Sequence, residues 1–286
     1  MTLTIRQIIA ELHQQLAGQY PQTEIESFAR ILFGHYLKMT PLRMHLLQDD
    51  ELPDEAVQQI RAAIADLRKN RPIQYILGVT EFCGLKFEVT PDVLIPRPET
   101  EELVDWVVRQ YDRDVALSLL DIGTGSGCIA VALAAAFRNA CVWAVDISEA
   151  ALTVALRNAR ANHVKIAFLL GDILNRELSI GFPPESLDVI VSNPPYIMLS
   201  EQQQIMPNVL DYEPHQALFA PDDDLIFYER MAALGMKCLK PHGKIFFEIN
   251  EAFPEKVADI LQRNNYSDIT ARKDINGKWR MVSAQK

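Results

Sequence analysis

A chain of 286 residues is long enough for two domains or one large one, and its 49% hydrophobic and 23% charged residues are ordinary for a globular protein. The formal net charge of −10 argues against a broad grip on nucleic-acid backbone. The first 75 residues are nearly neutral, with 8 of the 28 Lys and Arg and 9 of the 38 Asp and Glu, so the acidic excess lies further along the chain.

The chain contains no sign of a membrane or secretory protein. No uninterrupted apolar run approaches the roughly 20 residues that span a bilayer, and polar residues interrupt the N-terminus where an export signal needs an apolar block. The four cysteines are scattered, and the six histidines do not pair with them or with carboxylates at a ligand spacing. We therefore expect a cytoplasmic protein with reduced thiols and no metal site.

Residues 1–74 are predicted to form a small all-helical domain. Apolar residues recur at spacings of three and four, and Thr40 followed by Pro41 is typical of a cap and the first helical position. The expected helices lie at residues 5–16, from about 23 to 33, from 41, and at 53–67. Because this bundle carries no cofactor signature, we interpret it as a domain that recognises the substrate, and a purely structural cap is the alternative.

Residues 75–96 are predicted to be a linker that contains a short β-hairpin, formed by residues 80–82 and 85–89. Pro96 and Pro98 hold the following segment extended, and a helix is expected to begin near Glu101 with Thr100 or Glu99 as its cap. A plain linker would be less rich in charged and rigid residues. We therefore expect this segment to lie over a ligand.

From about residue 116, strands and helices alternate, which predicts an α/β fold with a largely parallel sheet covered by helices on both faces. The expected strands lie at residues 119–121, 141–145, 166–170, 187–191 and 244–249, with closing segments at 267–272 and 279–283. The expected helices lie at residues 128–137, 149–161, 225–239 and 254–263. The alternating pattern of residues 279–283 is typical of an edge or antiparallel strand.

A glycine-rich turn joins the first of these strands to the first helix. It reads Asp121-Ile122-Gly123-Thr124-Gly125-Ser126-Gly127, and the position suits a nucleotide-type ligand because glycine lets the backbone approach closely and a helix N-terminus offers free N–H groups. Asp146, at the end of the next strand, supplies the carboxylate that a ribose diol requires. The dinucleotide fingerprint would place glycine at position 128, where this chain has Cys128.

This turn resembles that of the S-adenosylmethionine-dependent methyltransferases of the seven-strand type. The resemblance implies that the turn lies against the methionine and ribose parts of S-adenosyl-L-methionine, which becomes S-adenosyl-L-homocysteine. Asp146 would bind the ribose hydroxyls and Asp172 the adenine, although Asp172 also suits a helix cap. The expected cofactor-binding residues are Asp121, Gly123, Thr124, Gly125, Gly127, Asp146, Ile147, Asp172 and Asn193.

A rigid corner follows the apolar run at residues 187–191. Its sequence is Ser192-Asn193-Pro194-Pro195-Tyr196, and two consecutive prolines cannot donate ladder hydrogen bonds, so the strand must stop there. The side chain of Asn193 and the carbonyl of Pro194 are then free to hold a flat substrate that carries an NH2 group. An Asn-Pro dipeptide is also common in turns without function.

The corner resembles the N-P-P-Y motif of methyltransferases that act on adenine N6, cytosine N4 or the glutamine amide. Residues 72–78, Glu81-Phe82-x-Gly84, and residues 93–101 (VLIPRPETE) further resemble the HemK/PrmC family, the glutamine-N5 methyltransferases of peptide-chain release factors. The match runs from about Arg71 to Tyr196.

By this resemblance residues 97–286 form the methyltransferase domain, and the substrate is the glutamine of the Gly-Gly-Gln loop of a class 1 release factor. It implies a monomer with no direct nucleic-acid substrate and no membrane partner. The expected catalytic residues are Asn193, Pro194 and Tyr196, and the substrate-binding residues add Pro195, Arg97 and Glu99.

Two segments depart from the family's pattern, namely Phe247-Glu248-Ile249-Asn250 and residues 220–225. We interpret both as loop variation, with Glu248 and the run Asp222–Asp224 as solvated surface. Three alternative functions stay open: a nucleic-acid adenine N6-methyltransferase, a glutamine methyltransferase of a ribosomal protein, and a catalytically inactive binding module. The acidic balance of the chain counts against the first.

Overall fold

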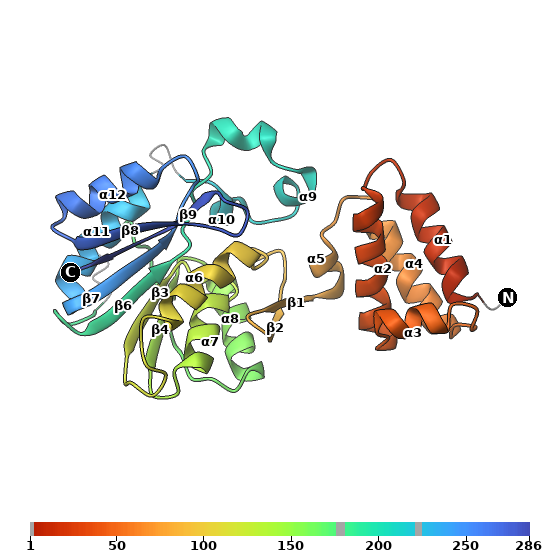
Figure 1. Cartoon of the computed structure of the whole chain (residues 1–286), viewed down its shortest axis with the longest axis horizontal. Coiled ribbons are helices and arrows are strands. Elements are labelled where there is room, and N and C mark those ends of the chain that lie inside the picture. Colours follow the sequence, from red (N-terminus) through yellow and green to blue (C-terminus); the bar gives the residue numbers. More distant parts are fainter. Residues whose placement is uncertain (1–2, 176–180, 221–224) are drawn as a thin grey trace. The chain divides into compact units, whose positions relative to one another are not determined.

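The computed structural model describes residues 3–175, 181–220 and 225–286 (Figure 1). The chain divides into two compact units. One unit comprises Met1–Gly78 with Met206–Tyr212, and the other comprises Val79–Ile205 with Glu213–Lys286. In the part of the chain that the structure describes, no helix combines the length and the apolar character needed to cross a bilayer.

The first unit is helical, as the sequence predicts, and its helices from α1 to α5 pack around one apolar core, to which α9 contributes no residue. Its elements are α1 (Ile5–Leu16), α2 (Gln22–Leu37), α3 (Pro41–Leu46), α4 (Asp54–Leu67), α5 (Ile73–Leu77) and α9 (Pro207–Leu210). The predicted start of α3 is confirmed, because the Thr40 side chain accepts a hydrogen bond from the Arg43 N–H and Pro41 stands at the first helical position. Neither α5 nor α9 was expected from the sequence.

The second unit begins with the predicted β-hairpin, formed by β1 (Val79–Phe82) and β2 (Leu85–Glu88). Asn158, at the buried side of the helix α8 (Glu149–Ala161), fastens this hairpin to the glycine turn. Its Oδ1 accepts from the Glu88 N–H at 2.6 Å, and its Nδ2 donates to the carbonyls of Glu88 and Ser126 at 3.0 and 2.9 Å. A single buried amide therefore holds the two segments in register.

The helix α6 (Pro98–Val108) starts earlier than predicted. It begins at Pro98 with Arg97 as its N-cap, and no side chain caps it. Thr100 lies inside the first turn, where its hydroxyl donates to Glu248 at 2.7 Å. The prediction that Thr100 or Glu99 caps a helix starting near Glu101 was wrong, because proline at the first helical position needs no N–H partner and frees the hydroxyl for a tertiary contact.

The rest of the unit is the predicted α/β fold, with a seven-stranded sheet in the order β5-β4-β3-β6-β7-β9-β8 (Figure 1). The five strands from β5 to β7 are parallel, and β9 runs antiparallel to both of its neighbours. The strands are β3 (Ser118–Ile122), β4 (Cys141–Asp146), β5 (Ala167–Leu170), β6 (Leu187–Ser192), β7 (Leu239–Glu248), β8 (Ser267–Lys273) and β9 (Trp279–Gln285). The other helical elements are α7 (Cys128–Ala136), the 3-10 helix η1 (Leu199–Gln204), α10 (His215–Leu218), α11 (Ile226–Cys238) and α12 (Pro254–Arg263).

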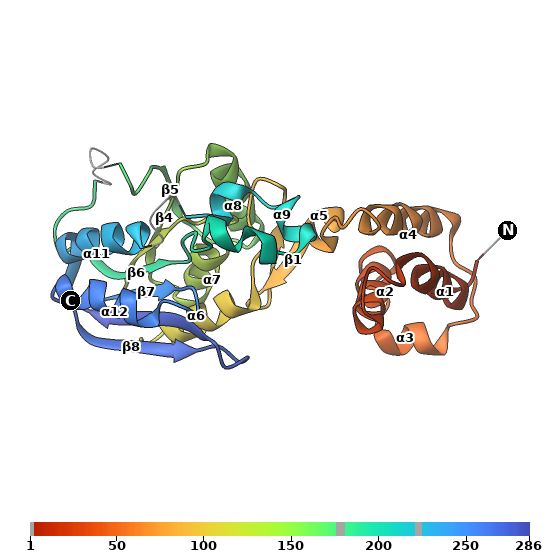
Figure 2. The ribbon, with the colours of Figure 1, turned by 90° about the horizontal axis from the view of Figure 1, so that it is seen from above.

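Alternate residues of each central strand pack on opposite faces of the sheet. Leu119 of β3 joins a core with α6 and α7, whereas Leu120 joins a core with α11 and α12. Figures 1 and 2 show these two pairs of helices on opposite sides of the sheet. The continuous apolar runs in these strands follow from burial on both faces.

Two strands differ in detail from the prediction. β7 begins at Leu239, before the Pro241-His242-Gly243 turn, and its register with β6 shifts between Leu187 and Val189 to accommodate the extra residues. β9 is antiparallel, as one of the two interpretations of residues 279–283 proposed, but it lies between β7 and β8 and is not an edge strand.

The sheet geometry fixes where a ligand can bind. The carboxyl ends of β3, β4, β5 and β6 lie at the same edge of the sheet, because these neighbouring strands are parallel. In α/β sheets of this kind, the loops that follow the strands at that edge form the ligand crevice.

The packing of α11 gives a test of the core. Gly235 faces Tyr266, whose hydroxyl donates to the Ala232 carbonyl at 2.9 Å, and a Cβ at position 235 would overlap that hydroxyl. We expect Gly235→Ala to destabilise the protein by about 1–3 kcal/mol, because the steric cost exceeds the roughly 1 kcal/mol that alanine gains in a helix. Denaturant unfolding measures this change in the free energy of unfolding.

A matched substitution separates the clash from helix propensity. Gly34, in α2, has only the Met39 carbonyl within van der Waals distance of an added Cβ, so Gly34→Ala is expected to be neutral or stabilising. If both alanine variants change stability alike, the proposed overlap with Tyr266 is wrong.

Candidate active site

A cavity of about 300 Å³ lies at the carboxyl ends of the parallel strands, in the second unit. Its volume is at the lower end of the range for small-ligand sites, roughly 300–1,000 Å³. Its walls come from the loops after β3, β4, β5 and β6, from residues 92–94 and 214–219, and from the helix α11 through Phe227 and Met231. The polar residues of the loops after β4, β5 and β6 that line it include Asp146, Ser148, Asp172, Ser192 and Asn193.

The glycine turn forms one wall of this cavity. Gly123, Gly125 and Gly127 have φ angles of 73°, 55° and 81°, a region that disfavours residues with a Cβ. Gly123 and Gly125 line the cavity with open space where a Cβ would stand, so a ligand can approach the backbone there. Gly127 instead faces α8, where an added Cβ would come within 3.0 Å of the Ala155 Cβ.

Asp146 ends β4 and lines the cavity beside the glycine turn. Its two carboxylate oxygens accept from the N–H groups of Gly125 at 2.7 Å and Ser148 at 2.9 Å. Burial raises the pKa of this carboxyl group, and these N–H donors oppose the rise. A carboxylate has about four acceptor positions, so Asp146 retains capacity for a pair of hydroxyl groups.

Asp172 follows β5 and also lines the cavity. Its Oδ1 accepts from the Leu174 N–H at 2.8 Å, so in the described residues it closes a turn and does not cap a helix. Ile147 lines the cavity as well and is 48% exposed, which is high for a large apolar side chain. The predicted cofactor roles of these residues stay predictions.

Asp121 and Thr124, at the start and in the middle of the glycine turn, are buried and are not among the residues that line the cavity. The buried Asp121 Oδ2 accepts from the Thr124 hydroxyl at 2.6 Å and from the Ala130 N–H at 3.2 Å, and its Oδ1 has no hydrogen-bond partner. Desolvation raises the pKa of Asp121 to about 7. These hydrogen bonds stabilise the turn and join it to the start of α7. The expectation that Asp121 and Thr124 contact a cofactor stays a prediction.

The Asn-Pro-Pro corner also forms part of the cavity wall, since Asn193, Pro194 and Pro195 all line the cavity. The strand β6 ends at Ser192, whose hydroxyl donates to the Ile122 carbonyl at 2.7 Å and so ties the corner to β3. The structure thus places the corner and the glycine turn around one space. Both were predicted from separate segments of the sequence.

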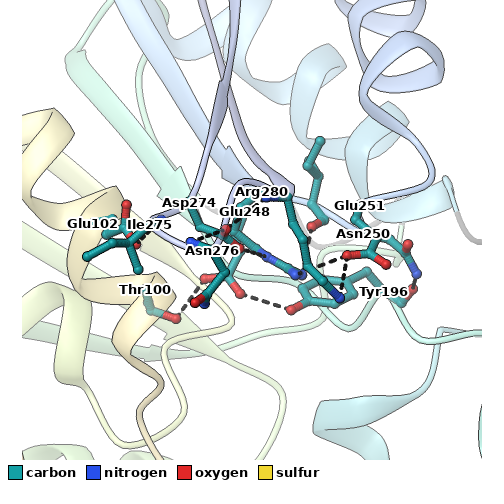
Figure 3. Close-up of polar contacts among 12 residues, drawn as sticks. Thr100, Glu102, Tyr196, Glu248, Asn250, Glu251, Asp274, Ile275, Asn276 and Arg280 are labelled. Carbon is teal, nitrogen blue, oxygen red and sulfur yellow. Dashed lines mark hydrogen bonds and ion pairs between the residues drawn. The ribbon is translucent and has the colours of Figure 1, made fainter. Parts of the chain in front are cut away.

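Glu248 contradicts the prediction that it is solvated surface. It ends β7 and is 1% exposed, and its carboxylate accepts from the Tyr196 hydroxyl at 2.9 Å and from the Thr100 hydroxyl at 2.7 Å (Figure 3). Asn193 Nδ2 in turn donates to the Thr100 hydroxyl at 3.1 Å. The prediction failed because two segments that are distant from Glu248 in the sequence, α6 and the corner after β6, cover this carboxylate.

Asn250 lies in the loop after β7, in agreement with its interpretation as a loop residue. Asn250 is 8% exposed, and its Nδ2 donates to the Tyr196 carbonyl and to Glu201 Oε2, both at 3.3 Å. It therefore supports the backbone just after the corner. The run Asp222–Asp224 lies outside the described residues.

Arg97 and Glu99, predicted to bind substrate, are not among the residues that line the cavity. Arg97 forms an ion pair of 2.5 Å with Glu213, whose second oxygen accepts from the Ile95 N–H at 3.2 Å. Glu213 is buried, and it joins the backbone at Ile95 and the Arg97 side chain to the segment 214–219, which lines the cavity. No role was expected for Glu213 from the sequence. Substrate binding by Arg97 and Glu99 stays a prediction.

Comparisons with known proteins agree with this architecture. Residues 7–78 match a family model described as the PrmC N-terminal domain, and residues 119–211 match one described as a methyltransferase domain. The release factor glutamine methyltransferase of Bacteroides thetaiotaomicron is 41% identical to this chain, over 99% of this chain and 100% of its own length. That of Flavobacterium psychrophilum is 40% identical, over 98% of each chain.

The chain belongs to the release factor glutamine methyltransferase family. It is therefore an S-adenosylmethionine-dependent methyltransferase, and the predicted family, fold class and type of enzyme are confirmed. The crystal structure of a methyltransferase from Pyrococcus furiosus is similar in fold, with a TM-score of 0.50 and 21% identity over 71% of this chain and 89% of that chain.

The cavity fits the cofactor of this family. S-adenosylmethionine carries a ribose diol and a compact methionine part. The Asp146 carboxylate has acceptor capacity for the diol, and Gly123 and Gly125 leave room for a close approach of the ligand to the turn. The Asp172 carboxylate lines the same cavity after β5.

The raised pKa of Asp121 predicts a pH-dependent stability. Because the folded-state pKa of about 7 lies above the ordinary value of 3.8, ionisation opposes folding, and stability is lost as the pH rises from about 4 to 7. Asp121→Asn removes this charge. The free energy of unfolding of the variant should therefore rise relative to the parent by at most about 1.4 kcal/mol per pH unit in that window.

Denaturant unfolding of the cofactor-free protein at pH 4 to 8 measures this difference, with the exposed Asp259→Asn as the matched control. A difference between Asp121→Asn and the parent that does not change with pH would show that the buried carboxyl does not titrate in this range.

Proposed function

We propose that this chain transfers the methyl group of S-adenosylmethionine to the side-chain amide nitrogen, N5, of the glutamine in the Gly-Gly-Gln loop of class 1 peptide-chain release factors. The observation that carries the proposal is that one cavity is lined both by the glycine turn with Asp146 and by the corner with Asn193 and Pro194. The names of the curated relatives support the choice of a release factor as the acceptor.

The corner suits a planar amide as the acceptor. An amide N–H2 group has two donors, and the Asn193 side-chain oxygen and the Pro194 carbonyl supply two acceptors at the cavity wall. These acceptors fix the plane of the amide and increase the electron density on its nitrogen, whose lone pair is otherwise delocalised. Tyr196 follows directly in the sequence and covers the flat face of the amide in this proposal.

The main task of the protein in this reaction is to align the acceptor nitrogen with the methyl group. Bound S-adenosylmethionine supplies a methyl group that its sulfonium has already activated. The chain's own residues therefore need no strong base before attack, because the amide proton can leave after the methyl group has arrived. Alignment for an in-line displacement and acceptors placed against the developing positive charge are the contributions of Asn193 and Pro194.

In this proposal one chain is the active unit, and the glycine turn and the corner that line its cavity both belong to the second unit. The helical unit recognises the release factor, and the reaction takes place in the cytoplasm, where translation terminates. The alternatives of a nucleic-acid or ribosomal-protein substrate become outcomes of the experiment below.

A transfer assay tests the choice of acceptor. We expect purified protein with methyl-labelled S-adenosylmethionine to label a class 1 release factor and to leave DNA, RNA, ribosomal proteins and free glutamine unlabelled. A release factor with alanine in place of the loop glutamine is the control and should take no label. Label in nucleic acid or ribosomal protein alone would refute the assignment.

A substitution in the corner tests the amide clamp. Asn193→Ala removes one of the two acceptors, and we expect kcat to fall by about 10²- to 10³-fold while the cofactor dissociation constant changes by less than about threefold. Radiolabel transfer and calorimetric titration of the cofactor measure the two quantities.

The exposed Asn139→Ala is the matched control, since the Asn139 amide only donates to the Asp114 carbonyl, away from the cavity. Parental turnover in Asn193→Ala would show that the corner does not hold the acceptor.

A further inference from the structure

We propose that Glu248 is a positioning residue that sets the orientation of the two groups on either side of the acceptor, the Asn193 amide through Thr100 and the Tyr196 ring directly. Figure 3 shows Glu248 between the side chains of Thr100 and Tyr196. The inference rests on the proposed function, because it concerns the same clamp. It assigns roles to Glu248 and Thr100, which lie outside the Asn-Pro-Pro-Tyr motif.

The direction of each hydrogen bond follows from chemistry. The Thr100 hydroxyl donates its one proton to Glu248 Oε2, at 2.7 Å, as it must when the carboxylate is ionised and can only accept. The Thr100 oxygen can then only accept from its other neighbour, Asn193, at 3.1 Å. Asn193 must therefore present its NH2 group to Thr100, which leaves its carbonyl oxygen for the cavity that it lines.

This orientation of the Asn193 amide matters because an asparagine side chain can be flipped, so that its oxygen and nitrogen exchange places with almost no change in shape. A turned Asn193 would present two N–H donors to a substrate amide that also has two N–H donors, and the clamp would repel the acceptor. The chain from Glu248 through Thr100 removes that possibility. The Glu248 carboxylate thus fixes the orientation of the Asn193 amide through the Thr100 hydroxyl.

The second oxygen of Glu248 holds Tyr196. It accepts from the tyrosine hydroxyl at 2.9 Å, and Arg280, on β9, lies beside the same hydroxyl. Burial raises the pKa of Glu248, and the hydrogen bonds from Thr100 and Tyr196 and the charge of Arg280 oppose that rise. Arg280 also forms an ion pair of 3.2 Å with Asp274, in the turn between β8 and β9, so the ring is linked to this antiparallel pair of strands.

Two substitutions at position 100 separate positioning from packing. Thr100→Val keeps the shape and removes the hydroxyl, and we expect kcat to fall by about 10- to 100-fold with an unchanged cofactor dissociation constant. Thr100→Ser restores the hydroxyl and should return kcat to within about threefold of the parent. Turnover is expressed per cofactor-binding site, so that loss of folded protein does not enter the comparison.

Glu248→Gln is the second test of the positioning role, because it keeps the volume of the side chain. Thr100 and Tyr196 donate to different oxygens of Glu248, and glutamine replaces one of these oxygens by an NH2 group that only donates. It therefore cannot accept from both hydroxyl groups at the two positions, and kcat should fall at least as far as in Thr100→Val. Combining Thr100→Val with Asn193→Ala should add no further loss, because Thr100 acts through Asn193. Thr270→Val, which removes an exposed hydroxyl on β8, is the control.

The outcomes separate this inference from the proposed function. If the parent does not methylate a release factor, the proposed function fails. If the parent does so and Thr100→Val or Glu248→Gln keeps parental kcat, the positioning role is wrong. It is also wrong if serine fails to rescue valine, or if Thr100→Val lowers turnover equally with and without Asn193. Serine rescue together with non-additivity supports it.

Discussion

The structure around the cavity depends on the burial of the Glu248 carboxylate. A buried charge must be met by hydrogen-bond donors, and each polar group left without a partner costs about 1 to 3 kcal/mol. The donors come from α6 and from the corner after β6, through Thr100 and Tyr196. Satisfying this one group therefore draws three distant segments together, and the same contacts hold Asn193 beside the cavity.

The cofactor half of the cavity follows from a different constraint. Parallel strands bring their carboxyl ends to one edge of the sheet, so the glycine turn after β3, Asp146 after β4 and the corner after β6 become neighbours. Glycine is required in the turn by its positive φ angles. Backbone geometry thus shapes the part of the cavity formed by the glycine turn. The buried Glu248 carboxylate positions the part formed by Asn193.

The sequence predicted the sheet, the helical unit and both motifs, because hydrophobic periodicity and strand-to-loop punctuation are local signals. It failed at Glu248, whose partner Thr100 lies 148 positions away, and at Glu213, which pairs with Arg97 across 116 positions. One signal was available. A carboxylate that directly follows the apolar run of a central parallel strand stands at the ligand edge of the sheet, where polar residues of the site collect.

The most direct test of the account is to map the methyl group on the product. After reaction with S-adenosylmethionine, a class 1 release factor is digested and the modified peptide is fragmented in a mass spectrometer. The account predicts one methyl group on the side-chain nitrogen of the glutamine in the Gly-Gly-Gln loop. A methyl group on a lysine, on a carboxylate or on another glutamine would contradict the clamp that Asn193 and Pro194 are proposed to form.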